Sequence, residues 1–123
     1  MRHEFEPLSA TVIQAAIDVH KALGPGFLEA IYHRALRVAL LHREVPHEVQ
    51  KEVRVAFEGV DVGVHVLDLF VAGQIVVELK AVKALEDIHF AQVKSYLKAT
   101  GARTGLLLNF NAPTLVIKRV MLG

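Results

Sequence analysis

The stretch DLFVAGQIVVELK, residues 68–80, places three charged side chains in an otherwise apolar segment. Two apolar runs flank Gly73, a residue that readily takes positive φ, and this pattern predicts a β-hairpin. Charged side chains between apolar neighbours are costly to bury unless they are paired or bind a metal. The stretch therefore predicts both a part of the core and a candidate site.

The length of the hairpin loop decides whether those charges meet. With a three-residue loop over residues 72–74, Asp68 lies opposite Glu78. Because side chains alternate along a strand, Lys80 then shares their face. The opposite face is apolar throughout: Leu67, Leu69, Val71, Ile75, Val77 and Leu79. A two-residue loop would separate the two acids, so we expect the three-residue loop and an antiparallel hairpin over residues 64–80.

Two carboxylates on one face of a hairpin would lie about 5 Å apart and repel each other unless a proton or a cation joins them. Carboxylate oxygens suit Mg²⁺. The alternative is ordinary surface chemistry, in which Glu78 and Lys80 face solvent and Asp68 pairs with a surface base. For the hairpin alone this alternative is the commoner one, because the pattern Asp…Glu-x-Lys is short.

Length and composition limit the classes of protein to which this chain can belong. Its 123 residues, 53% of them hydrophobic, predict a single domain over residues 1–123 with a true core and argue against disorder. There is no cysteine, so disulfides and thiolate zinc sites are excluded. No apolar run reaches the ~18 residues of a membrane span, and the first residues lack the order of a signal peptide. We expect a cytoplasmic protein with no membrane partner.

Charge is unevenly distributed along the chain. The net charge is only +1, but residues 1–79 carry 7 basic and 11 acidic side chains, whereas residues 80–123 carry 7 basic and 2 acidic ones. The C-terminal third can therefore face an anionic partner. Basic residues such as Lys94 and Lys98 that merely solubilise the surface explain the bias equally well.

Hydrophobic periodicity predicts the element order ααβββαββ, which gives an α/β fold with a mixed sheet flanked by helices. The expected helices span residues 10–23, 27–42 and 86–100, and the expected strands outside the hairpin span residues 48–57, 104–110 and about 115–120. Ser9 is expected to cap the first helix. The apolar run 104–110 follows a helix and is expected to form a parallel strand buried on both faces.

Faces can be assigned to two of these elements. In the second helix the expected buried stripe is Leu28, Ile31, Tyr32, Ala35, Leu36 and Ala39. Glu29 lies on the side of that stripe, either as an inward carboxylate or as a first-turn residue stabilised by the helix dipole. In the strand 48–57, one half-buried face is expected to hold Val49, Val53, Val55 and Phe57.

Several kinds of site are absent from the sequence. The seven histidines show neither His-x-x-x-His nor His-Glu-x-x-His spacing, and there is no phosphate-binding glycine motif. Ser9 and Ser95 are the only serines, and neither lies in a nucleophile elbow.

Two patterns point to a known family. Asp68…Glu78-Leu79-Lys80, followed by a helix carrying Gln92-x-x-x-Tyr96, resembles the PD-(D/E)xK nuclease superfamily, which includes restriction-type and repair nucleases. More narrowly, LGPGFLEAIY over residues 23–32 resembles the signature of the GxxExxY proteins. The similarity runs from about residue 12 to residue 120. The proline before the first acid in the superfamily pattern is absent here.

In the narrower signature, Gly26, Glu29 and Tyr32 hold the named positions. The departure from the superfamily pattern lies at Leu67, which stands where the proline would be. That proline is often missing in the superfamily, so the departure weakens the resemblance little.

The resemblance implies a restriction-endonuclease-like fold and a divalent-metal site for Mg²⁺ or Mn²⁺. Asp68, Glu78 and Glu29 would bind the metal, and we expect Glu29 to point toward the other two carboxylates. Lys80 would orient the attacking water and stabilise charge on the phosphate. Gln92 and Tyr96 would line the site or contact the nucleic-acid backbone. The implied reaction is hydrolysis of a phosphodiester in DNA or RNA.

Two other functions stay open at this point. The chain can be a non-catalytic nucleic-acid-binding or regulatory module that kept the fold, or a protein-interaction or self-association domain. The four residues Glu29, Asp68, Glu78 and Lys80 together favour a nuclease, since a purely structural domain does not need clustered acids. Reading a base sequence with a domain of this size would require a loop, a homodimer or a partner.

Overall fold

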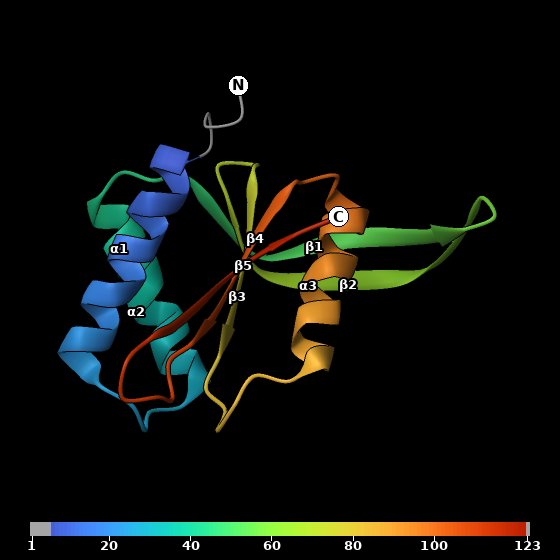
Figure 1. Cartoon of the computed structure of the whole chain (residues 1–123). Coiled ribbons are helices and arrows are strands. Elements are labelled where there is room, and N and C mark those ends of the chain that lie inside the picture. Colours follow the sequence, from blue (N-terminus) through green and yellow to red (C-terminus); the bar gives the residue numbers. More distant parts are fainter. Residues whose placement is uncertain (1–5, 123) are drawn as a thin grey trace.

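The computed structural model describes residues 6–122 as a mixed sheet with helices on both faces (Figure 1). The elements in chain order are α1 (Glu6–Leu23), α2 (Glu29–His42), β1 (His47–Phe57), β2 (Val60–Val71), β3 (Ile75–Lys80), α3 (Asp87–Thr100), β4 (Thr104–Asn109) and β5 (Val116–Met121). The five strands lie in chain order across the sheet, β3 and β4 in parallel and the other neighbours antiparallel. The predicted α/β class and element order are confirmed.

The core forms two layers of apolar side chains, one on each face of the sheet. Helices α1 and α2 cover one face, and α3 covers the other (Figure 1). Strand β4 is buried at every position, as expected for a parallel strand between two helical layers. β1 and β2 extend past α3 as a long two-stranded arm (Figure 1).

Helix α1 begins earlier than the sequence predicts, so Ser9 does not cap it. The helix starts at Glu6, and Pro7 lies in its first turn, where a proline is well tolerated because that backbone nitrogen needs no helical partner. Ser9 is buried inside the helix, and its Oγ accepts a hydrogen bond from Arg119 Nη1 at 2.9 Å. This contact joins α1 to β5.

The buried stripe of α2 is also narrower than predicted. Tyr32, Leu36, Ala39 and Leu40 are buried, whereas Ile31 is exposed and Leu28 is 74% exposed. The helix begins at Glu29, so Leu28 stands outside it in extended conformation and cannot lie over the stripe.

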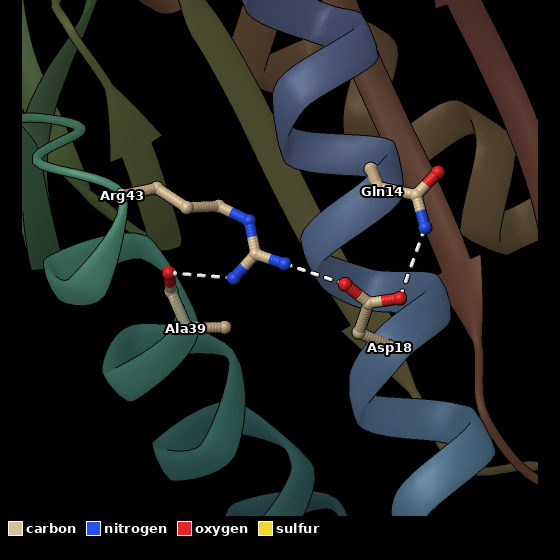
Figure 2. A network of polar contacts seen from close by, with 4 residues as sticks. All are labelled: Gln14, Asp18, Ala39 and Arg43. Carbon is tan, nitrogen blue, oxygen red and sulfur yellow. Dashed lines mark hydrogen bonds and ion pairs between the residues drawn. The ribbon is translucent and has the colours of Figure 1, made fainter.

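A polar network joins the two helices at the C-terminal end of α2 (Figure 2). Arg43 donates to the Ala39 carbonyl oxygen at 3.0 Å and forms an ion pair with Asp18 of α1. Gln14 Nε2 donates to the other Asp18 oxygen at 2.9 Å. The Asp18 carboxylate is therefore fully engaged, and the helices are connected by charge as well as by their apolar layer.

The central hairpin has the predicted three-residue loop. Leu69 pairs with Val77 and Val71 with Ile75, which leaves residues 72–74 as the turn. Gly73 has φ +66°, and Gln74 N–H donates to the Val71 carbonyl oxygen at 2.9 Å. The register argument from the sequence is confirmed for this part of the hairpin.

The alternation of side chains in β1 and β2 is broken at Gln50, and a separate register shift lies between Val55 and Ala56. Gln50 has φ +50°, and it lies between the pairs Val49↔Leu69 and Lys51↔Leu67 without a pair of its own. Beyond this point both strands exchange faces. Leu69 belongs to the layer under α1 and α2, whereas Leu67 belongs to the layer under α3.

Two predicted faces are therefore wrong. Leu67 does not continue the apolar face of Leu69, and Val53 packs against the α3 layer while Val49 packs against the other one. The reason is the left-handed backbone at Gln50, which no periodicity argument detects because the hydrophobic pattern continues unchanged.

Helix α3 has well-defined ends. The Glu86 side chain and the third helical residue, His89, form a reciprocal capping box at the N-terminus. Gly101 ends the helix in left-handed conformation with φ +77°. Within residues 6–122 no helix is both long and apolar enough to cross a membrane.

Candidate functional site

Asp68 sits where the β2–β3 ladder ends. The last pair is Leu69↔Val77, and the Asp68 carboxylate then takes the role of a ladder acceptor, with Oδ2 receiving the Leu79 N–H at 3.1 Å. From α2, His33 Nε2 donates to the Asp68 carbonyl oxygen at 3.1 Å, since a carbonyl can only accept. The irregularity at Asp68 thus places its carboxylate against β3 and connects its backbone to α2.

Glu78 is a buried carboxylate on β3, only 5% exposed. The pKa of Glu78 is raised to about 8, first by burial and next by the Asp68 carboxylate, while Lys80 and a hydrogen bond from the Asp68 backbone oppose the shift. Oε2 lies 3.8 Å from Lys80 Nζ, but Oε1 is buried without a hydrogen-bond partner. The charge of Glu78 is therefore only partly compensated by the residues around it.

Lys80 lies two residues after Glu78 on the same strand, so both side chains project from one face. Its side chain is mostly buried. The backbone around it is held by β4, because the Lys80 carbonyl oxygen accepts the Phe110 N–H at 2.9 Å. The ammonium group is thus supported beside the Glu78 carboxylate.

Asn109 is a supporting residue that the sequence analysis missed. It is 2% exposed, and its side-chain amide bonds both the N–H and the carbonyl of Val82, at 3.0 and 2.9 Å. These two hydrogen bonds hold the segment that follows Lys80 against the end of β4. The only signal in the sequence is a polar residue at the end of the apolar run 104–110.

Glu29 opens α2 and is partly exposed. Its pKa is raised by partial burial and next by the Asp68 carboxylate, while Lys80 and His33 lower it. Glu29 also raises the pKa of Glu78. The three carboxylates therefore interact electrostatically, although Glu29 lies at the solvent side of the group.

The loop before α2 is held by the residues of the sequence signature. Gly26 has φ +107°, a conformation that side chains rarely adopt. Tyr32 OH donates to the Gly24 carbonyl oxygen and accepts the Phe27 N–H at 3.1 Å, and its ring stacks on Phe110 at 4.7 Å. This arrangement determines where α2 starts and hence where Glu29 lies.

Gln92 and Tyr96 lie one helical turn apart on α3. Gln92 Oε1 is buried without a hydrogen-bond partner. The pKa of Tyr96 is raised by burial and then by Glu78 and Asp68, so its hydroxyl lies within the field of the carboxylates. The Tyr96 ring makes an edge-to-face contact with His65 at 4.7 Å.

A divalent cation such as Mg²⁺ needs several oxygen donors gathered around one point. Among residues 6–122, no group of three or more His, Cys, Asp or Glu side chains is gathered closely enough to hold a metal. However, Glu78 Oε1 and Gln92 Oε1 are buried acceptors without partners, and such groups are uncommon because each costs free energy. The unpartnered Glu78 oxygen, beside the interacting Asp68 carboxylate, fits a hard cation such as Mg²⁺.

His33 is the other residue that sequence reasoning missed. It lies one helical turn after Glu29, lowers the pKa of Glu29, and bonds the Asp68 backbone. The spacing of four residues from Glu29 was the available signal, since such positions share a helix face. His33 links the two acids from different elements.

Comparison with known proteins agrees with this arrangement. The profile of the PD-(D/E)XK nuclease superfamily matches residues 6–120, nearly the whole chain. No match is found among curated proteins. The match extends from α1 to β5 and includes every residue of the candidate site, and we conclude that the chain belongs to the PD-(D/E)XK nuclease superfamily.

Proposed function

We propose that this protein is a divalent-metal-dependent nuclease that hydrolyses phosphodiester bonds of DNA or RNA. The observation that supports this most is Glu78, a buried carboxylate with one oxygen unpartnered and with Asp68 close enough to raise its pKa. Burying an incompletely paired charge costs stability, so a domain serving only as a scaffold gains nothing from it.

Asp68 and Glu78 would hold Mg²⁺ or Mn²⁺, with Glu29 acting directly or through water. The Leu79 carbonyl is a further donor, because Leu79 N–H faces Asp68 and a strand residue directs both backbone groups to the same side. When bound, the cation supplies positive charge that polarises the phosphodiester and acidifies water. Each of these oxygens is a hard ligand that suits this ion.

Lys80 would orient the attacking water and stabilise negative charge on the phosphate. Its ammonium group is mostly buried and lies 3.8 Å from Glu78 Oε2, so it is held beside the carboxylates. A preorganised cation at the developing charge is worth far more in such a site than in water. The water oxygen would attack phosphorus and the bond to the leaving oxygen would break, with Gln92 and Tyr96 lining the site.

The narrower GxxExxY family is the second part of the proposal. Its three named residues have physical roles here: Gly26 takes positive φ, Tyr32 bonds the loop through its hydroxyl, and Glu29 starts the helix that this loop positions. In this proposal, the residues of the signature together position the carboxylate of Glu29. Replacing Tyr32 with Phe should loosen the loop and weaken the contribution of Glu29.

A second function is favoured by one observation. Glu29 is partly exposed, and the described residues contain no ready group of three acids. A module that binds nucleic acid without cutting it would keep the fold and the basic C-terminal third but would not need a tight metal site. This candidate makes the opposite prediction for cleavage.

The test is metal binding followed by cleavage. We expect calorimetry to detect Mn²⁺ and Mg²⁺ binding to the wild type, and a mixture of single- and double-stranded DNA and RNA to be cut only when metal is added. Lys80→Ala should cut far more slowly and bind metal equally well or slightly better, because a nearby cation is lost. Lys83→Ala is the matched control, since Lys83 is exposed on the following loop. If the wild type cuts no nucleic acid with either metal, the binding-module function takes precedence.

A further inference from the structure

A groove of about 410 Å³ lies between α3 and the two-stranded arm. Arg54 and Val55 of β1, His65 of β2, and Ser95, Lys98 and Ala99 of α3 line it. Its volume falls within the ~300–1,000 Å³ of ordinary ligand sites. None of the proposed catalytic residues lines this groove, so it is distinct from the candidate site.

The groove nevertheless adjoins Tyr96 through one aromatic contact. The rings of His65 and Tyr96 meet edge to face at 4.7 Å, with His65 on the groove side. Tyr96 in turn lies within the field of Glu78 and Asp68. A chain-like ligand leaving the carboxylates past Tyr96 would therefore enter the groove.

Charge changes sign along this path. The candidate site holds three interacting carboxylates, whereas the groove lining contains no acidic residue and includes Lys98, Arg54 and His65. Arg54 forms an ion pair with Asp61 at 2.8 Å, but both side chains are largely exposed, and such pairs open at little cost. Lys98 is exposed, and the lining of the groove contains no acidic residue that would compete for it.

A second groove extends the basic path beyond Lys98. It has a volume of about 360 Å³ and runs past the end of α3, with Lys98 on one side and Arg103 on the other. Lys98 thus borders both grooves. An anionic polymer that occupies both grooves would pass Lys98, which borders both, and Arg103, which lines the second.

We propose that these two grooves bind the sugar–phosphate backbone of the substrate strand on one side of the bond that is cut, with Lys98 contacting a phosphate next to the scissile one. This inference rests on the proposed nuclease function. Backbone contacts of this kind position a strand without reading its bases. They also give a role to two of the seven basic residues of the C-terminal third, Lys98 and Arg103.

The first test measures binding in EDTA, without metal, so that cleavage does not enter. A labelled single-stranded oligonucleotide should bind Lys98→Gln several-fold more weakly than wild type at low salt. Its salt dependence should also be shallower by about 0.7 in log–log slope, the loss of one phosphate contact on a single strand. Lys21→Gln, on the exposed surface of α1, is the charge-matched control and should bind like wild type.

The second test locates the strand. The chain has no cysteine, so Ser95→Cys introduces one thiol in the groove and Ala22→Cys introduces one on the exposed surface of α1. Saturating oligonucleotide should slow maleimide labelling of Ser95→Cys several-fold and leave that of Ala22→Cys unchanged. A saturated complex in which Ser95→Cys labels at the free rate would overturn the proposal.

The two proposals fail in different ways. Suppose that the wild type cuts nucleic acid, but Lys98→Gln binds as tightly as wild type and Ser95→Cys is not protected. The proposal that the grooves bind the strand is then refuted, and the proposed nuclease function is retained. If Lys98→Gln binds weakly and Ser95→Cys is protected but no variant cuts, the groove is supported and catalysis is wrong.

Discussion

Strand β2 has two halves that are similar in composition but differ in burial. In the inner half, residues 67–71, Leu67, Leu69 and Val71 are fully buried. In the outer half, residues 60–66, the four valines at alternate positions are between 41% and 63% exposed. Both halves pair with β1 along nearly their whole length. The same ladder therefore supports a core strand at one end and a solvated arm at the other.

The difference comes from the helices. Helices α1 and α2 cover the inner half on one face and α3 covers it on the other, whereas the arm extends beyond α1 and α2 and is reached by α3 at His65, which contacts Tyr96 (Figure 1). The boundary falls between Val66 and Leu67, next to the irregularity at Asp68 and Gln50 where the side chains exchange faces. Hydrophobic composition thus explains strand formation in both halves, while burial depends on which helices reach them.

The largest expected effect is a difference in cleavage rate between substitutions of the two aspartates of β2, Asp68 and Asp61. We expect Asp68→Asn in the inner half to lower metal-dependent cleavage by at least about a hundredfold, as when one essential polar group is lost from a catalytic site. The fold should persist, because the Asn oxygen can still accept the Leu79 N–H, and metal-free stability should hold or rise as carboxylate repulsion is relieved. Cleavage rates with Mg²⁺ and thermal melts in EDTA measure both.

Asp61→Asn in the outer half is the control for that comparison. Asp61 lies on the same strand and pairs only with Arg54 and the Gly63 amide. The Asp61→Asn variant should cut nucleic acid at the wild-type rate. Equal activity of Asp68→Asn and Asp61→Asn would show that the inner half does not contain the catalytic centre.

A stability difference of several kcal/mol is expected next. Leu69→Ala should lower the free energy of unfolding by about 2–5 kcal/mol, because it leaves a cavity under α1 and α2. Val62→Thr in the arm keeps the β-branched shape and should change the free energy of unfolding by less than about 0.5 kcal/mol. Urea denaturation of both variants measures this, and a large loss for Val62→Thr would mean that the arm is covered in solution.

The third expectation concerns pH and the buried acid of β3. The pKa of Glu78 is raised from 4.5 to about 8 in the folded chain, so the folded state binds more protons than the unfolded one between these values. Stability without metal should therefore fall as pH rises through this range, by at most about 1.4 kcal/mol per pH unit, and level off above it.

Glu78→Gln should remove this dependence and be more stable than wild type near pH 8. Glu52→Gln, an exposed acid of β1, should leave the wild-type curve unchanged. Urea denaturation in EDTA from pH 5 to 9 measures all three proteins. Parallel curves for wild type and Glu78→Gln would contradict the assigned cause.

The smallest effect is expected from the ion pair of the arm. Arg54→Gln removes the pair with Asp61, whose side chains are 73% and 50% exposed. Surface pairs of this kind contribute about 0.2–1 kcal/mol and less at high salt. We therefore expect a loss below about 1 kcal/mol in dilute buffer and almost none in 1 M NaCl. A larger loss that survives salt would mean that Arg54 packs as part of the core.

Several features of the site were predictable from local pattern. The three-residue loop of the hairpin followed from Gly73 and from keeping the acids on one face, and the parallel strand β4 followed from an apolar run after a helix. Both depend on short-range rules of chain geometry. Asn109 and His33 were not predictable in the same way, because each acts on a residue that is distant in sequence.

By itself, the sequence determined the order of elements and the three-residue loop of the hairpin, and it predicted that Asp68, Glu78 and Lys80 lie together, since these depend on periodicity and spacing. Only the tertiary structure decided the change of face at Gln50 and Asp68, the burial of Glu78 Oε1 and the exposure of the arm. Burial is a property of the elements that meet, and hydrophobic periodicity does not record how far a neighbouring helix reaches.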